Sequence, residues 1–483
     1  MMFRLALRSL LAHPLRSAVL AGGFGLGVSV MATLLGVGEV ILLQARAPAL
    51  LGGGDVVVFG TTGRVGSARH VLASVLGTPP FAERVRAASP TTRAALYLVR
   101  EGRTVPIRGR GGVPSLERAM GDPETSGIAA WTDAPADAAW AAPDPGDVLR
   151  AMDRFHPIPD VPGRESSWAE WLYFNGRAGD TRFYLTFLVG GRRPGGRRAA
   201  GVRLQLDRAG RPSSYGEARD VDEAEVLASA PDLTVGGSRV RLEGLRYRLT
   251  VDLPGGPDAA GRRRGRTGRV SGEIVVEASP GRSLPPLAIH GAGGWLSGYV
   301  VPVMAGTLAG WLVVDGERLP LDGGTAYHDH NWGFWEGVTW QWGQVHHRDL
   351  SVVYGRVRPP EDAADPERVP GFLAVLGPDG PLGYSADVAI EETGDPGADR
   401  PARILVRGRG PALDLTMELG VLGTVVTRMP EGAFGGGMDF HQLRVRYRVS
   451  GRAGGRELSF EAPGSAETFR GRGGAAAAPD AAP

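Results

Sequence analysis

Apolar and polar residues alternate with a period of two over most of the chain after Trp168. This alternation is typical of β-strands that bury one face and expose the other. Arginines between the apolar positions, such as Arg446 and Arg448, are then expected on the solvated face. The clearest stretches have apolar residues at 202, 204 and 206, at 245, 247, 249 and 251, at 413, 415, 417 and 419, and at 443, 445, 447 and 449.

Turns rich in glycine and proline separate these stretches, as at Pro254–Pro257 and Pro378–Pro381, which favours antiparallel neighbours. The strand-rich region is too long for one small barrel. We therefore predict a mainly β chain with two consecutive antiparallel β-barrels behind one N-terminal transmembrane helix. The predicted segments are a lead and anchor at 1–50, an uncertain connection at 51–150, a first β domain at 151–325, a second at 326–473, and a disordered tail at 474–483.

The connecting region carries few patterns. Asp55–Phe59 has the composition of a short strand, and His70–Leu76 has that of a short helix. Ala129–Asp147 is rich in alanine, proline and aspartate, which is typical of a linker. We assign no chemistry to this region.

An uncharged run from Ser17 to Gly38 precedes all of this, and it is long enough for a helix to cross a hydrocarbon core of ~30 Å. Arg4, Arg8 and Arg16 come before the run, and no acidic residue does. The positive-inside rule therefore places the N-terminus in the cytoplasm. We expect a single-pass inner-membrane protein whose bulk is periplasmic or otherwise extracytoplasmic.

A cleaved signal peptide is the alternative, because Ala45-Arg46-Ala47 has the small-x-small form of a cleavage site. The apolar run is longer than a usual signal core, and Pro48 would directly follow the cut. Both points favour a retained anchor.

Composition narrows the possible functions. The net charge is +2, and the basic residues alternate with acids, so nucleic acid is not an expected partner. Cysteine is absent, which excludes disulfides, thiolate catalysis and cysteine-based zinc sites. No phosphate-binding loop or nucleophile elbow occurs, and we expect no cofactor.

The chemistry is concentrated between Ala326 and Asp349, which hold four of the nine histidines and four of the ten tryptophans. Histidine can transfer protons near neutral pH, and indole offers a large apolar face with one donor. If 327–332 is extended, His328 and His330 lie on one face, with Tyr327, Asp329 and Asn331 on the other. The stretch predicts a lined, partly dry pocket.

Two motifs resemble the hydroxyneurosporene synthase superfamily, which contains carotenoid 1,2-hydratases and AttH-type proteins encoded beside ABC exporters. Trp168-Ala-Glu-Trp-Leu-Tyr-Phe-Asn-Gly176 opens the β region, and Tyr327-His-Asp-His-Asn-Trp-Gly333 follows later. The resemblance covers residues 150–473 and implies two lipocalin-like barrels with a lipophilic site near their junction. Residues 5–39 separately resemble the first span of an ABC-transporter permease of the macrolide-exporter or lipoprotein-release type.

The resemblance implies an acid/base and cation-stabilising set, for which we select Tyr327, Asp329, His330, Trp332 and Tyr354. Hydration of an alkene needs a proton donor, an aromatic wall for the cation and an activated water. The expected ligand-binding residues are Trp171, Tyr173, His328, Trp335, Trp340 and Trp342. A structural role for the same residues, as barrel core and a buried pair, is an equal alternative.

Two details qualify this assignment. The family pattern leads us to expect an acid two residues after Tyr354, but Arg356 stands there and does not release a proton in proteins. Asp349 or Glu336 would have to substitute for it. We place His290, His441 and Glu467 at turns or on the surface.

A metal site is a second reading, because His328-x-His330 followed by Glu336 resembles the cupin pattern of ligands. The glutamate comes one or two residues too late, and we expect no metal.

The sequence therefore supports two functions. The first is an anchored, extracytoplasmic, lipocalin-like protein that binds a hydrophobic, isoprenoid-like small molecule and serves an ABC exporter. The alternative is a hydro-lyase that adds water to an isoprenoid double bond.

Overall fold

The computed structural model describes residues 12–52, 56–59, 65–77, 81–101, 103–121, 128–255, 268–394, 400–429 and 438–471. Arg4, Arg8 and the tail at 474–483, on which part of the topology and tail predictions rest, lie outside these residues. The chain divides into two compact units. The first unit comprises 1–64 and 86–141, and the second comprises 65–85 and 142–483.

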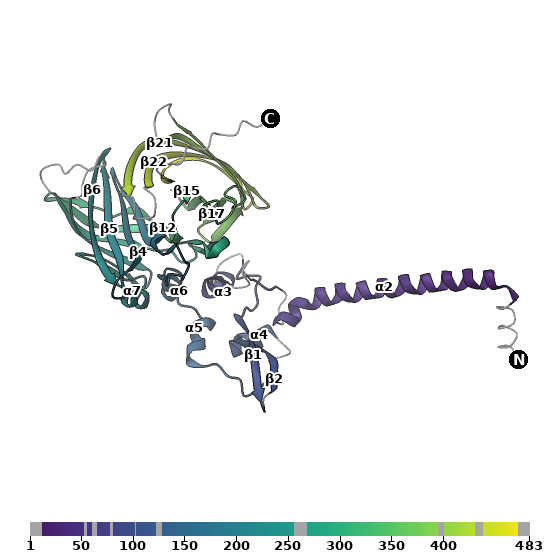
Figure 1. The fold of residues 1–483 in the computed structure, drawn as a ribbon. Helices are drawn as coiled ribbons and strands as arrows, with labels where there is room; N and C mark the ends of the chain where they lie inside the picture. Colours follow the sequence, from purple (N-terminus) through teal and green to yellow (C-terminus); the bar gives the residue numbers. More distant parts are fainter. Residues whose placement is uncertain are drawn as a thin grey trace. The chain divides into compact units, whose positions relative to one another are not determined.

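The first unit is built around the long helix α2 (Pro14–Gly52) and a two-stranded antiparallel sheet (Figure 1). By length and composition, Pro14–Leu34 of α2 is apolar enough to cross a membrane, which agrees with the uncharged run in the sequence. No strand forms over Val56–Phe59, where one was expected. The other elements of this unit are β1 (Thr91–Arg100), β2 (Arg103–Gly112), α4 (Pro114–Met120), η1 (Pro135–Asp137) and α5 (Ala138–Ala141).

The second unit begins with two helices, α3 (Ala68–Gly77) and α6 (Pro145–Met152). The helix expected at His70–Leu76 is thus present as α3. Asp144 starts α6 by accepting hydrogen bonds from the backbone N–H groups of Gly146 and Asp147, at 2.8 and 3.0 Å. The segment expected to be a linker therefore holds short helices.

The larger part of the second unit is two antiparallel sheets, each curled into a nearly closed barrel (Figure 1). Within the described residues, the first sheet has twelve strands in the order β6-β5-β4-β3-β14-β12-β10-β9-β8-β7, with β11 and β13 also paired to β12. A backbone bridge between Tyr215 and Gly255 joins β6 to the end of β9. Its strands are β3 (Trp168–Ala178), β4 (Thr181–Arg193), β5 (Arg197–Arg208), β6 (Arg211–Asp222), β7 (Leu233–Val235), β8 (Ser238–Glu243), β9 (Arg246–Pro254), β10 (Arg269–Glu277), β11 (Leu284–His290), β12 (Leu296–Val314), β13 (Glu317–Pro320) and β14 (Gly324–Phe334).

The second sheet has nine strands in the order β18-β17-β16-β15-β23-β22-β21-β20-β19. Its end strand β18 approaches β20, where the hydroxyl of Ser385 donates to the carbonyl oxygen of Arg409. Its strands are β15 (Thr339–His347), β16 (Leu350–Arg358), β17 (Phe372–Gly377), β18 (Gly380–Ser385), β19 (Asp387–Gly394), β20 (Pro401–Gly410), β21 (Leu413–Met429), β22 (Met438–Ala453) and β23 (Arg456–Gly471). The prediction of a mainly β chain with two consecutive barrels is confirmed.

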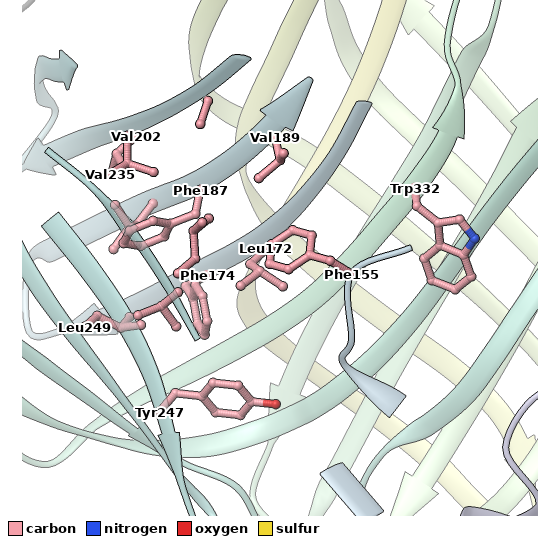
Figure 2. Close-up of a cluster of buried hydrophobic side chains, with 14 of the residues drawn as sticks. Phe155, Leu172, Phe174, Phe187, Val189, Val202, Val235, Tyr247, Leu249 and Trp332 are labelled. Carbon is pink, nitrogen blue, oxygen red and sulfur yellow. The ribbon is translucent and has the colours of Figure 1, made fainter. Parts of the chain in front are cut away.

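The period of two explains the interior of each barrel. Tyr247, Leu249 and Val251 are buried in the first barrel, while Arg246 and Arg248 between them are exposed. Figure 2 shows part of this interior, where Tyr247 and Leu249 lie on the same side as Phe174, Leu172 and Phe187.

β14 belongs to the first barrel, because it pairs with β3 on one side and β12 on the other. The first sheet therefore continues past residue 326, where we placed the boundary, and the second sheet begins at Thr339. Gly333, which closes the second motif, has φ of 143°, and a side chain there would meet the carbonyl oxygen of Leu296 at 2.5 Å. That position requires glycine.

The two barrels pack through outward-facing strand residues along a surface that we call the barrel seam. Tyr173, Tyr299 and Tyr327 of the first barrel form one buried cluster with Trp342 and Phe372 of the second. Polar pairs cross the same surface, namely Gln205 to Thr427 at 2.7 Å, Arg444 to Asp207 at 3.3 Å and Arg182 to the carbonyl oxygen of Gly464 at 3.4 Å. Outward-facing residues at the seam are therefore buried.

Candidate functional site

The chemistry of the second motif divides between the two faces of β14. His328, His330 and Trp332 point into the first barrel, and Tyr327 and Asp329 point into the barrel seam. This is the separation that the period of two predicted for an extended 327–332. Asp329 and His330 are neighbours in sequence but belong to different sites.

The inward face carries a buried set of charged and polar groups that we call the inner network: Asp153, His156, Glu170, His328 and His330. Asp153 caps the C-terminal end of α6, and its two oxygens accept from His328 Nε2 at 2.9 Å and His330 Nδ1 at 2.8 Å. The other nitrogen of His330 donates to Glu170 Oε1 at 2.9 Å. The same oxygen lies 2.7 Å from His156 Nδ1.

Opposite charges fix the protonation states of this network. Burial disfavours a charged His330, but the hydrogen bonds and charges of Asp153 and Glu170 outweigh it and raise the pKa of His330 to about 9. Burial likewise works against both carboxylates, yet the histidines lower the pKa of Asp153 to about 2 and that of Glu170 to about 2. At neutral pH Asp153, Glu170 and His330 are therefore ionised and paired with one another.

Aromatic rings pack against the histidines of the inner network. His328 stacks on Phe174 with ring centres 4.0 Å apart, and Tyr247 meets it edge-on at 4.7 Å. His156 stacks on Trp332 at 4.2 Å. Figure 2 shows Phe174, Tyr247 and Trp332 around this part of the barrel, together with Phe155. The inner network is thus packed as well as paired.

The outward face of β14 presents a different arrangement, which we call the seam group: Tyr173, Tyr327, Asp329, Trp342 and Glu467. Asp329 lies opposite Tyr173 in the pairing of β14 with β3, and Glu467 lies opposite Trp342 in the pairing of β23 with β15. The indole N–H of Trp342 donates to the Tyr327 hydroxyl at 2.8 Å, which joins the two barrels.

Both carboxyl groups of the seam group favour the protonated form. Burial raises the pKa of Asp329 to about 7, although hydrogen bonds from Tyr327 and Asn331 oppose the shift. Burial and the charge of Asp329 raise the pKa of Glu467 well above its usual value. Asn331 Nδ2 donates to Asp329 Oδ1 at 2.6 Å. The charge of His330, on the other face of β14, also lowers the pKa of Asp329, but burial outweighs it.

Polar groups at the seam have few partners within the described part of the chain. The side chains of Tyr173 and Glu467 interact with each other, and Asn331 Oδ1 is buried without a hydrogen-bond partner. A buried polar atom without a partner costs about 1–3 kcal/mol.

The structure does not bring the predicted catalytic residues to one place. Tyr327 and Asp329 are in the seam group, and His330 and Trp332 face the interior of the first barrel. Tyr354 faces the interior of the second barrel, where its hydroxyl has no partner among the described residues.

The predicted ligand-binding residues divide in the same way. Tyr173 and Trp342 are in the seam group, and His328 is in the inner network. The remaining tryptophans form a chain of ring contacts, from Trp171 to Trp335 at 4.5 Å, from Trp335 to Trp340 at 5.4 Å and from Trp340 to Trp342 at 6.0 Å. This chain leads from the junction of the barrels toward the seam group.

Sequence reasoning missed four functional groups: Asp153, His156, Glu170 and Glu467. Glu170 did carry a signal, because it stands between Trp168 and Leu172 on the buried face of β3. Glu467 and His441 were wrongly placed at turns or on the surface, since each is 3% exposed. Glu467 faces outward from its own barrel, and only the other barrel buries it.

The remaining polar predictions are less central. Arg356 is half-buried and forms an ion pair with Glu367 at 3.4 Å. Glu336 is exposed in the turn after β14. Among the described residues, the ligand atoms that converge within 4.8 Å belong to His156, Glu170 and His330, which is not the set suggested by the cupin-like spacing.

No family model matches the chain, and no curated protein matches it. Fifteen chains of solved structures match, and three of them are the following. The putative AttH of Nitrosomonas europaea is 15% identical with a TM-score of 0.43, over 65% of this chain and 99% of that one. CghA, solved with Sch210972, is 14% identical with a TM-score of 0.42, over 68% and 95%. Kievitone hydratase from Nectria haematococca is 12% identical with a TM-score of 0.40, over 64% and 93%.

By name, one of these neighbours is a putative AttH and another is a hydratase. The permease-like character of residues 5–39 stays a prediction.

Proposed function

We propose that the chain binds a hydrophobic, isoprenoid-like small molecule at the barrel seam, beside Asp329 and Glu467. The observation that carries this proposal is the coincidence of buried acids with aromatic surface. Asp329 and Glu467 are buried beside Tyr173, with no ion pair to either acid among the described residues, and Trp342 and Tyr299 belong to the same buried cluster, with ring centres 5.2 Å apart. A ligand with an apolar body and one polar group suits both features.

Acid/base catalysis is the second candidate, and the raised pKa values of Asp329 and Glu467 favour it. A protonated carboxyl group at neutral pH can donate to one carbon of a double bond, which breaks the π bond and forms a C–H bond. The cation left on the other carbon is stabilised by aromatic faces. Water then forms the C–O bond and returns a proton to the carboxylate, so that the net reaction is hydration.

The pair of acids suits this cycle better than a single acid does. Because the two groups interact, one proton is held between them more readily than two are released. One carboxyl group then donates while the other, ionised, orients the attacking water. The inner network has no part in this step, since its carboxylates stay ionised and paired.

The binding test uses the full-length chain in detergent micelles, with lycopene or neurosporene as the probe. We expect the probe to quench tryptophan fluorescence and Glu467→Gln to weaken its affinity. Glu336→Gln, at an exposed acid, is the matched control and should leave the affinity unchanged. Equal affinities in wild type and folded Glu467→Gln would contradict binding at the seam.

The hydration test analyses the product of the same incubation for the tertiary alcohol. The enzyme function predicts alcohol in wild type and none in Asp329→Asn or Glu467→Gln. Binding without alcohol in any variant leaves the carrier function. Robust turnover that survives both substitutions would contradict catalysis by the seam group.

We also propose that α2 anchors the chain in the inner membrane with the barrels outside, in association with an ABC exporter permease. The uncharged run and the arginines before it support this topology. A reporter that is active only in the periplasm, fused after Pro483, should give signal in the membrane fraction. A soluble mature form that starts near Pro48 would contradict the anchor.

A further inference from the structure

We infer that the inner network holds a divalent transition-metal site, with His156 Nδ1, His330 Nε2 and an oxygen of Glu170 as ligands. These atoms come from three separate parts of the chain and lie within 4.8 Å of one another. Both ring nitrogens point at the same atom, Glu170 Oε1, at 2.7 and 2.9 Å. This site lies on the opposite face of β14 from the seam group and does not depend on its function.

The donor set suits the proposed ion. Two imidazole nitrogens and one carboxylate are the ligands that zinc and non-haem iron take in proteins, with one or more positions left open. Around a tetrahedral zinc, with bonds of ~2.0–2.1 Å, ligand atoms stand about 3.3 Å apart. The Glu170 oxygen, now 2.7 and 2.9 Å from the two nitrogens, therefore needs to move about half an ångström away from each of them. His156 can make that movement, because its side chain is 26% exposed.

The surroundings of the ligands are those of a metal centre. A ligating histidine usually donates its other ring N–H to a carboxylate, which fixes the tautomer and orients the ring. His330 Nδ1 does so to Asp153 Oδ1 at 2.8 Å, and the other oxygen of Asp153 is held by His328 at 2.9 Å. Asp153 is thus a positioning residue and not a ligand.

The other two ligands are also held in place. The backbone N–H of His156 donates to both oxygens of Glu170 at 3.0 Å. Arg198, fully buried, donates to the carbonyl oxygen of His156 at 3.3 Å. The ring of His156 is stacked on Trp332 at 4.2 Å. The three side chains are therefore gathered before an ion arrives, which reduces the cost of ordering the site on binding.

Charge also fits. Without an ion, both nitrogens of His330 must carry protons to bond with two carboxylates. A divalent ion replaces the protons on His330 Nε2 and His156 Nδ1, and Asp153 keeps its bond to the remaining N–H. The site exchanges protons for metal without leaving a buried carboxylate unpaired.

The experiment uses the full-length chain in detergent, stripped with a chelator and then dialysed against Zn²⁺ or Co²⁺. Bound metal is measured by elemental mass spectrometry, and Co²⁺ is followed by its visible ligand-field absorption. We expect about one equivalent in wild type and at least a tenfold loss of affinity in His156→Ala. His290→Ala, at an exposed histidine, is the matched control and should bind as wild type does.

His156→Ala is the decisive variant, because His156 is partly exposed and its loss leaves the buried Asp153–His330–Glu170 chain intact. Glu170→Gln is a second variant, to be used only if near-UV circular dichroism shows a native fold. No bound ion in wild type, or wild-type binding in folded His156→Ala, would overturn the proposal. Neither result bears on ligand binding at the seam.

Discussion

Buried carboxyl groups lie against both faces of β14, and their pKa values are shifted in opposite directions on the two faces. On the inner face, Asp153 and Glu170 are paired with histidines, and each has a pKa of about 2. On the outer face, Asp329 has no cation bonded to it and its pKa is about 7. Burial is complete in both places. The presence of an oppositely charged partner, and not the depth of burial, decides whether a buried acid stabilises the fold or remains available to transfer a proton.

The largest expected effect is on the free energy of unfolding, when the ion pairs of the inner network are broken. Asp153→Asn removes the anion between His328 and His330 and leaves a cation in a buried site. We expect the free energy of unfolding to fall by about 3–5 kcal/mol, as for other broken buried ion pairs. Urea denaturation at pH 7 measures it, with Glu336→Gln as the exposed control. A change under 1 kcal/mol would mean that the network contributes little.

The pH dependence of wild type is the next largest effect. His330 has a pKa of about 9 in the folded chain, against 6.5 for an unperturbed histidine. Its contribution is therefore fully present below pH 6.5 and is lost as the pH rises through 9, by about 3 kcal/mol. The measurement is urea denaturation from pH 6 to 10 with a chelator present. Asp153→Asn should show a smaller loss over this range.

Substituting the acid on the outer face should have the opposite effect on stability to Asp153→Asn. Asp329 is protonated in the fold up to pH 7 but ionises near 3.8 when unfolded. Its contribution to stability is present below pH 3.8 and lost as the pH rises through 7. Asp329→Asn removes this loss, so we expect it to stabilise the chain at pH 8 by about 1–3 kcal/mol and to have little effect at pH 4.

A destabilised Asp329→Asn variant at pH 8 would show that the carboxylate of Asp329 is paired after all. The experiment is informative because the same substitution should abolish hydration if the chain is a hydratase. Gain of stability with loss of activity is the pattern expected of a functional residue.

The smallest expected effect is on lycopene affinity, and it distinguishes the tryptophan at the seam from the one inside the first barrel. Trp342→Phe removes the hydrogen bond to Tyr327 and should weaken lycopene binding by about fivefold to tenfold, or ~1 kcal/mol. Trp332→Phe changes a ring that packs on His156 inside the first barrel, and should leave the affinity unchanged. Quenching titrations of both variants measure the difference. The reverse order would place the ligand inside the first barrel.

Local pattern was enough to predict the strands and the split of β14 into two faces. Period-two burial depends only on neighbouring residues, as at Tyr247 and Leu249. The seam could not be predicted in this way. Glu467 has the pattern of an outward, solvated position on β23, and it is buried only because a second barrel covers that face.

The inner network illustrates the same limit. Asp153 and Glu170 meet His330 from 177 and 160 residues away in sequence, so spacing alone did not connect them. The motif identified the correct strand, because the histidines and Asp329 of β14 are central to both groups. It did not identify their partners, which come from α6, β3 and β23.

The position of Asp153 has a mechanical consequence. The chain passes from α6 through Asp153 and His156 before it enters the ladder of β3. Arg150 of α6 also donates to the carbonyl oxygen of Ala230, at 3.2 Å. Tension applied at the α6 end is therefore borne first by these side-chain bonds. The buried carboxylate of Asp153 must leave its site before the hydrogen bonds of β3 can break.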